Sequence, residues 1–282
     1  DGGRGLVGAL FGILGVVIFS FFLTLEPESA GVHESREAFR YVVLVSSGIV
    51  TVVGILVWFF MQMDREIEKK VLLEHITLSQ IREVLRLPAV GLLMIIILCA
   101  YTGYKITDVF SLYAQDVMLY DQVDAAKVGS FLLFIRQVIG VLIGILADRT
   151  QTTLWLLISF GVSFSGALLF ATGIISDSTT TLFFISILVV ATGVYAARSL
   201  YFAVMERGKI PLVLTGTAVG LISIIGYTPD IFAGPGMGYL LDNSPGETGH
   251  QHVFWALALF SLVGGIAAWF YYRLYGKRFE EK

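Results

Sequence analysis

The chain has 282 residues, of which 56% are hydrophobic and only 15% are charged, and its mean hydropathy is +0.81. Because a soluble domain carries about 25% charged residues, this composition excludes a soluble globular protein. It indicates a helical membrane protein, and a net charge of −3 gives no reason to expect a nucleic-acid partner. The single cysteine, Cys99, excludes an intrachain disulfide and a metal site built on a cysteine cluster, so we expect no metal and no other cofactor.

The chain begins Asp1-Gly-Gly-Arg4, without Met, and enters an apolar stretch within four residues. We expect such a beginning in a fragment of a longer protein.

Eight stretches reach the roughly 20 mostly apolar residues that a helix needs to cross a bilayer. They run roughly over residues 5–25, 41–61, 89–113, 128–147, 153–175, 181–205, 212–241 and 253–275. Since lipid offers no partner for free backbone groups, these stretches must be helical, and we predict an all-α integral membrane protein. The seventh stretch contains Pro229 and Pro235, which predict a kink or a break.

The longest connection, residues 62–88, is charged and amphipathic. Its apolar residues recur at roughly helical spacing: Leu72, Leu73, Ile76, Ile81, Val84 and Leu85. We interpret it as a helix on the cytoplasmic membrane surface, which divides the chain into two spans (1–61), a linker (62–88) and a six-helix bundle (89–282).

The basic residues of the connections set the orientation. With the Asp148-Arg149 connection inside, only Arg36, Arg40 and Lys127 lie outside. The inside set contains thirteen residues: Arg4, Arg65, Lys69, Lys70, Arg82, Arg86, Arg149, Arg207, Lys209, Arg273, Lys277, Arg278 and Lys282. This bias predicts that both ends of the chain are cytoplasmic, in the cell (inner) membrane.

A short motif between the second and third of the last six spans carries a family resemblance. The residues Gly144 to Arg149 read G-I-L-A-D-R, which resembles the cytoplasmic-loop signature of the major facilitator superfamily of transporters. The resemblance implies that residues 89–282 are the C-terminal bundle, that the first two spans end the N-terminal bundle, and that about four spans of the missing N-terminal half precede them. Within the family, the chain is similar to the YihN-like group of bacterial permeases.

The same resemblance implies a gate at this connection, formed by Gly144, Asp148 and Arg149. In the family the signature continues with Gly-Arg-Lys/Arg, whereas this chain reads Thr-Gln-Thr-Thr from Thr150. A solvated turn is therefore an equally good interpretation of the Asp-Arg pair. Gly140 and Gly144, one turn apart, also form a small-residue face suited to close helix packing.

Ionisable residues inside spans are functional candidates because each is costly in lipid. Lys105 and Asp108 lie three residues apart and share a helix face. They either neutralise one another or, together with Tyr101 and Tyr104, hydrogen-bond a polar solute. Asp108 is also a candidate for proton coupling.

Three further charges lie within spans. Arg136 lies 12 residues before Asp148, about 18 Å along the helix, and needs an anionic partner, either Asp108 or an anionic group of a substrate. Arg198 is close enough to the predicted cytoplasmic end of its span to extend to the interface. Asp230 follows Pro229 in the broken helix, where it is a candidate proton carrier or a partner for Lys105. We interpret all four histidines, which fall in connections, as solvated.

These features favour a secondary active transporter of a small polar solute such as a sugar, a sugar acid or an organic anion. The chain has no P-loop, so the driving force would come from a proton, sodium or solute gradient. A non-transporting membrane sensor with a permease fold remains the alternative. An intramembrane enzyme is disfavoured, because the sequence contains neither H-E-x-x-H nor G-x-S-x-G.

Overall fold

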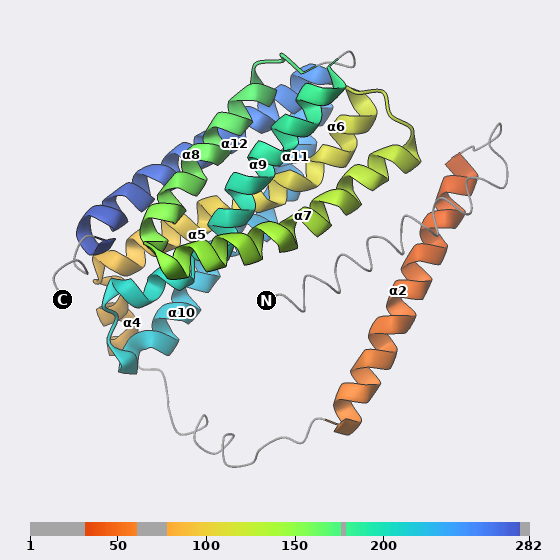
Figure 1. Ribbon diagram of the computed structural model, residues 1–282. Coiled ribbons are helices and arrows are strands. Elements are labelled where there is room, and N and C mark those ends of the chain that lie inside the picture. Colours follow the sequence, from red (N-terminus) through yellow and green to blue (C-terminus); the bar gives the residue numbers. More distant parts are fainter. Residues whose placement is uncertain (1–31, 61–77, 176–178, 277–282) are drawn as a thin grey trace.

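The computed structural model describes residues 32–60, 78–175 and 179–276, and within these ranges it contains helices and turns but no strand (Figure 1). The expected first span, residues 5–25, lies outside the described residues, as does most of the connection that follows residue 61. The all-α prediction is confirmed for the part of the chain that the structure describes.

Six helical segments within the described ranges are long and apolar enough to cross a membrane, and they correspond to the last six predicted spans. The first comprises α5 (Pro88–Ile106), a 3-10 turn (Thr107–Val109) and α6 (Phe110–Asp116). The next three are α7 (Gln122–Arg149), α8 (Thr152–Ala171) and α9 (Thr180–Leu200). The fifth comprises α10 (Leu212–Gly226) and α11 (Pro229–Asn243), and the sixth is α12 (Glu247–Tyr271), which continues as a π-helical turn.

Local sequence explains where several helices begin and break. Pro88 opens α5 and Pro229 opens α11 at a first-turn position, where the missing proline N–H loses no helical hydrogen bond. The Asp121 side chain accepts a hydrogen bond of 2.7 Å from the backbone N–H of Asp124 and so caps α7. The predicted break of the seventh stretch is therefore at Pro229, whereas Pro235 lies inside the continuous helix α11.

The bundle packs most closely where glycines let helices approach. The helix α9 lies against α8, α7 and α5, and α12 lies against α8, α5 and α11 (Figure 1). At the α8–α9 crossing, a Cβ atom on Gly193 would collide with the backbone of Ser163 and with the carbonyl oxygen of Ser159. The two backbones therefore touch at this point, which only glycine allows.

Two hydrophobic clusters fill the bundle, one at each end. One is rich in aromatic side chains and includes Phe110, Tyr113, Phe170, Phe183 and Phe254. The other includes Leu93, Ile96, Phe160, Leu200 and Tyr271. Along α5, residues up to Ala100 belong to the second cluster and residues from Ile106 belong to the first. The segment 101–105, with its polar side chains, lies between them.

Two helices lie before the bundle in the chain. The helix α2 (Val32–Phe60) contains the second predicted span, and its described apolar side chains are largely exposed, Trp58 by 83%. The helix α4 (Leu78–Leu85) is the described part of the predicted amphipathic linker, and it contacts α5 and α10. Of its apolar residues only Val84 is buried, while Leu78 and Leu85 are exposed.

The six spans alternate in direction, as Figure 1 shows, so the connections after α7 and after α9 share one end of the bundle with the beginning of α5. That end carries most of the basic residues in the described connections: Arg82, Arg86, Arg149, Arg207 and Lys209. This agrees with the prediction that successive connections lie on opposite sides of the membrane. Which end of the bundle faces the cytoplasm stays a prediction.

Candidate functional site

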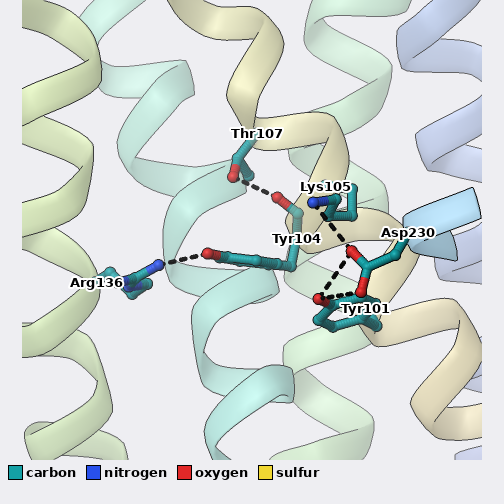
Figure 2. Close-up of polar contacts among 6 residues, drawn as sticks. All are labelled: Tyr101, Tyr104, Lys105, Thr107, Arg136 and Asp230. Carbon is teal, nitrogen blue, oxygen red and sulfur yellow. Dashed lines mark hydrogen bonds and ion pairs between the residues drawn. The ribbon is translucent and has the colours of Figure 1, made fainter. Parts of the chain in front are cut away.

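An ion pair between α5 and α11 forms the centre of a polar cluster in the middle of the bundle (Figure 2). The Nζ atom of Lys105 lies 3.1 Å from Oδ1 of Asp230. The hydroxyl of Tyr101 donates to the same carboxylate, 3.1 Å from each oxygen. Of the two partners predicted for Lys105, the structure therefore selects Asp230, which is brought beside α5 by the helix break at Pro229.

A second contact joins α5 to α7. The Nη1 atom of Arg136 donates to the hydroxyl of Tyr104 over 2.6 Å (Figure 2). Arg136 takes part in none of the ion pairs within the described ranges, so the predicted pairing with Asp108 is not formed. The guanidinium is thus held by a neutral hydroxyl and not by a carboxylate of the described residues.

Arg198 of α9 also belongs to this cluster, which the sequence did not predict. Its guanidinium carbon lies 3.9 Å from the ring centroid of Tyr104 and 5.2 Å from that of Tyr101. Both distances fall within the roughly 6 Å range of cation–π contacts. The prediction that Arg198 extends to the membrane interface is therefore wrong, because the two tyrosine rings hold its head group inside the bundle.

The sequence carries no local signal that Arg198 faces inward. In the structure the five residues from Gly193 to Ala197 that precede it are all buried, but their sequence is no more apolar than that of a helix that faces lipid. A helix that is apolar all round lies either in a protein core or in a membrane, so only the packing of α9 within the bundle decides the direction of this side chain.

Tyr104 is the residue that both arginines share, and the surrounding structure fixes its position. Its carbonyl oxygen accepts a hydrogen bond of 2.7 Å from the hydroxyl of Thr107, in the 3-10 turn (Figure 2). The buried Tyr195 lies with its ring centroid 6.4 Å from that of Tyr104, and its hydroxyl donates to Thr107 over 3.4 Å. The turn after α5 therefore holds the backbone of Tyr104, and the phenol itself contacts both arginines.

Asp108 is exposed at the same 3-10 turn and forms none of the ion pairs within the described ranges. The cluster then contains the cations Lys105, Arg136 and Arg198 and the carboxylates Asp108 and Asp230, which leaves one positive charge in excess. Within the described part of the chain, no group of His, Cys, Asp and Glu is arranged to hold a metal ion.

The predicted gate residues lie far along α7 from this cluster. Asp148 and Arg149 are exposed at the end of the helix, and the nearby Trp155 indole donates to the hydroxyl of Thr150 over 2.7 Å. Of the two glycines, Gly140 faces α9, where an added Cβ would lie 3.2 Å from the hydroxyl of Ser199, while Gly144 has open space. Among the described residues, close packing is therefore seen at Gly140 and not at Gly144, and the gating role of Gly144, Asp148 and Arg149 stays a prediction.

One histidine corrects the prediction that all four are solvated. His250 in the first turn of α12 is fully buried, and its Nε2 atom lies 3.1 Å from Oδ2 of Asp116 at the end of α6. The ring of Tyr113 packs edge-on against it, with 5.1 Å between the ring centroids. The sequence placed His250 in a connection because α12 begins at Glu247, well before the predicted span.

Comparison with known proteins identifies the family of this fold. Residues 2–209 match the family model described as MFS/sugar transport protein, and the chain belongs to that family, which confirms the predicted membership of the major facilitator superfamily. It is a multi-pass membrane protein.

Two curated relatives come from Escherichia coli strain K12. The chain is 25% identical to inner membrane protein YqcE over 267 residues, which are 91% of this chain and 62% of YqcE. It is 37% identical to inner membrane protein YihN over 75 residues, 27% of this chain and 18% of YihN. The chain thus spans less than two thirds of the length of either relative.

Proposed function

We propose that this chain is part of a secondary active transporter that moves a small anionic solute, such as a sugar acid or an organic anion, across the cell membrane. The observation that carries the proposal is the polar cluster on α5, α7, α9 and α11. Three cations meet there, and only Lys105 is paired directly with a carboxylate of the described residues. Charges placed in the middle of apolar helices are expensive, and an anionic solute compensates the excess.

The arrangement of the bundle supports a complete site built from two halves. Asp230 and Lys105 keep 50% and 29% of their side-chain surface exposed, and α7 carries a row of exposed apolar residues, among them Val141, Leu142 and Ile145. In the proposed transporter, residues 89–282 form one bundle, residues 62–88 are the linker, and the preceding helices belong to the other bundle, which supplies the opposite wall. Alternating access then comes from rocking of the two bundles around the site.

The coupling ion is proposed to be a proton carried by Asp230. Protonation of this carboxylate breaks the ion pair with Lys105 and releases α11 from α5, so a proton and the conformation of the site are linked. The gate at Gly144, Asp148 and Arg149 lies at the basic end of the bundle, which we place in the cytoplasm because of the bias in Lys and Arg. The names of both relatives agree with the inner membrane.

Uptake into proteoliposomes containing the intact protein tests this function. Arg136→Ala and Arg136→Lys should both lose uptake of an anionic solute while inserting normally, because Ala removes the hydrogen bond to the Tyr104 hydroxyl and Lys lacks the planar guanidinium that makes it. Asp230→Asn should keep solute exchange but lose proton-driven accumulation. Normal uptake by Arg136→Ala contradicts the proposed site, and unchanged accumulation by Asp230→Asn contradicts the proton role. A protein that binds solute without ever accumulating it is a sensor.

A further inference from the structure

The two arginines of the cluster differ in what they already bind. Arg136 has a short hydrogen bond to Tyr104. Arg198 has no ion pair within the described ranges, and its Nη1 atom is buried without a hydrogen-bond partner. A buried donor without an acceptor is costly, and no carboxylate of the described residues lies within ion-pair distance of Arg198.

The ring faces near Arg198 bear on the class of solute. A sugar ring commonly packs on an aromatic face, but Arg198 already lies over the rings of Tyr104 and Tyr101 at 3.9 and 5.2 Å. Tyr227 also meets Tyr101 edge-on, with 4.8 Å between the ring centroids. A neutral sugar would have to displace the guanidinium from Tyr104 in order to stack, whereas an oxyanion would bind the guanidinium itself.

We infer that Arg198 is the residue that binds the anionic group of the solute, and that Arg136 is a positioning residue that acts through Tyr104. This assignment rests on the proposed transport function and sharpens it to solutes that carry a carboxylate or a phosphate. The planar guanidinium offers a fork of donors that matches either oxyanion. The hydrogen bond from Arg136 fixes the phenol ring of Tyr104, which in turn fixes the guanidinium of Arg198.

Binding to the intact, purified protein tests the assignment with three probes of similar shape. Glucuronate carries a carboxylate, glucose 6-phosphate carries a phosphate, and glucose is the neutral control. The wild type should bind at least one anion at least about tenfold more tightly than glucose, since hydrogen bonds to charged groups contribute differences of this size. Preference for one anion over the other identifies the oxyanion that the site takes.

Substitutions at Arg198, Arg136 and Tyr104 then distinguish the role of Arg198 in binding the anion from the positioning role of Arg136. Arg198→Lys should weaken anion binding about tenfold and Arg198→Gln up to about a hundredfold, whereas neither change should weaken the binding of glucose. Arg136→Gln should weaken it less, and adding it to Tyr104→Phe should have no further effect, because both changes remove the same hydrogen bond. Lys127→Gln, which removes one positive charge from an exposed position, should bind like the wild type.

The outcomes distinguish the two levels of the proposal. If the wild type binds neither anion more tightly than glucose, the anionic solute of the proposed function is wrong. If the wild type prefers an anion but Arg198→Lys and Arg198→Gln keep its affinity, the proposed function stands and the role of Arg198 is overturned. If Arg136→Gln and Tyr104→Phe weaken binding independently, Arg136 is a second anion ligand and its role as a positioning residue is overturned. The unfolding temperature of each variant without ligand confirms that the protein is folded.

Discussion

The ion pair between Lys105 and Asp230 gives the sharpest test of how the bundle is held together at its polar centre. We consider Lys105→Met, Asp230→Asn and the double variant. The amide introduced by Asp230→Asn keeps an oxygen that accepts the Tyr101 hydroxyl bond, so this change removes mainly the charge opposite Lys105. Lys105→Met leaves Asp230 charged, and among the described residues the Tyr101 hydroxyl is then its remaining donor. Each single change therefore leaves one member of this pair charged without its partner, and the double variant removes both charges.

The expected magnitude follows from the geometry and the exposure. An exposed ion pair contributes about 0.2–1 kcal/mol, whereas loss of one partner of a buried pair costs about 3–5 kcal/mol. With a separation of 3.1 Å and side chains that are 29% and 50% exposed, the pair falls between these limits after allowance for screening. We expect each single variant to lose about 1–2 kcal/mol, and the double variant to be more stable than either single variant.

Thermal unfolding of the purified protein measures this difference, since about 1 kcal/mol shifts the unfolding temperature by roughly 2–4 °C for domains of about 150–250 residues. The pair Lys127–Asp124 is a matched control, because it is a salt bridge of 2.6 Å within one turn of α7 and both of its side chains are more than half exposed. The two single variants and the double variant of that pair should lose stability additively, with no measurable coupling between the two residues. Additive losses at Lys105 and Asp230 would refute the reasoning, since additivity means that the two charges do not stabilise one another.

Two further predictions concern packing. Gly193→Val should lower the unfolding temperature by several degrees or prevent folding, because its side chain would meet the backbone of α8 and overpacking costs about 1–3 kcal/mol. Gly161→Val, on α8 at a position with open space, is the matched control, and an equal effect of the two changes would contradict the close crossing. Asp116→Leu should also lower the unfolding temperature, because it removes the only hydrogen-bond partner of the buried His250 side chain within the described residues and an unsatisfied buried group costs about 1–3 kcal/mol. Asp116→Asn, which keeps an acceptor, should lower the unfolding temperature much less than Asp116→Leu. Equal unfolding temperatures for Asp116→Leu and the wild type would show that the contact does not stabilise the bundle.

The sequence alone determined the class of protein and the approximate positions of the last six spans, although α12 begins at Glu247, before the predicted span. Hydropathy and the lack of backbone partners in lipid require helices of a minimum length, and these are local properties of the chain. Pro229 likewise broke its helix where the sequence predicted, because a proline ring acts on the turn that contains it. The motif at Gly144–Arg149 identified the family for the same reason, since its residues are contiguous.

Only the tertiary structure decided which charges meet. Lys105 pairs with Asp230 rather than with its neighbour Asp108, Arg136 bonds Tyr104 in place of a carboxylate, and Arg198 and His250 turn inward. Each of these contacts joins different helices, and it depends on the rotation and tilt with which the helices pack. Those quantities are set by close approaches such as Gly193 against Ser163, which involve residues far apart in the chain, so no local pattern contains them.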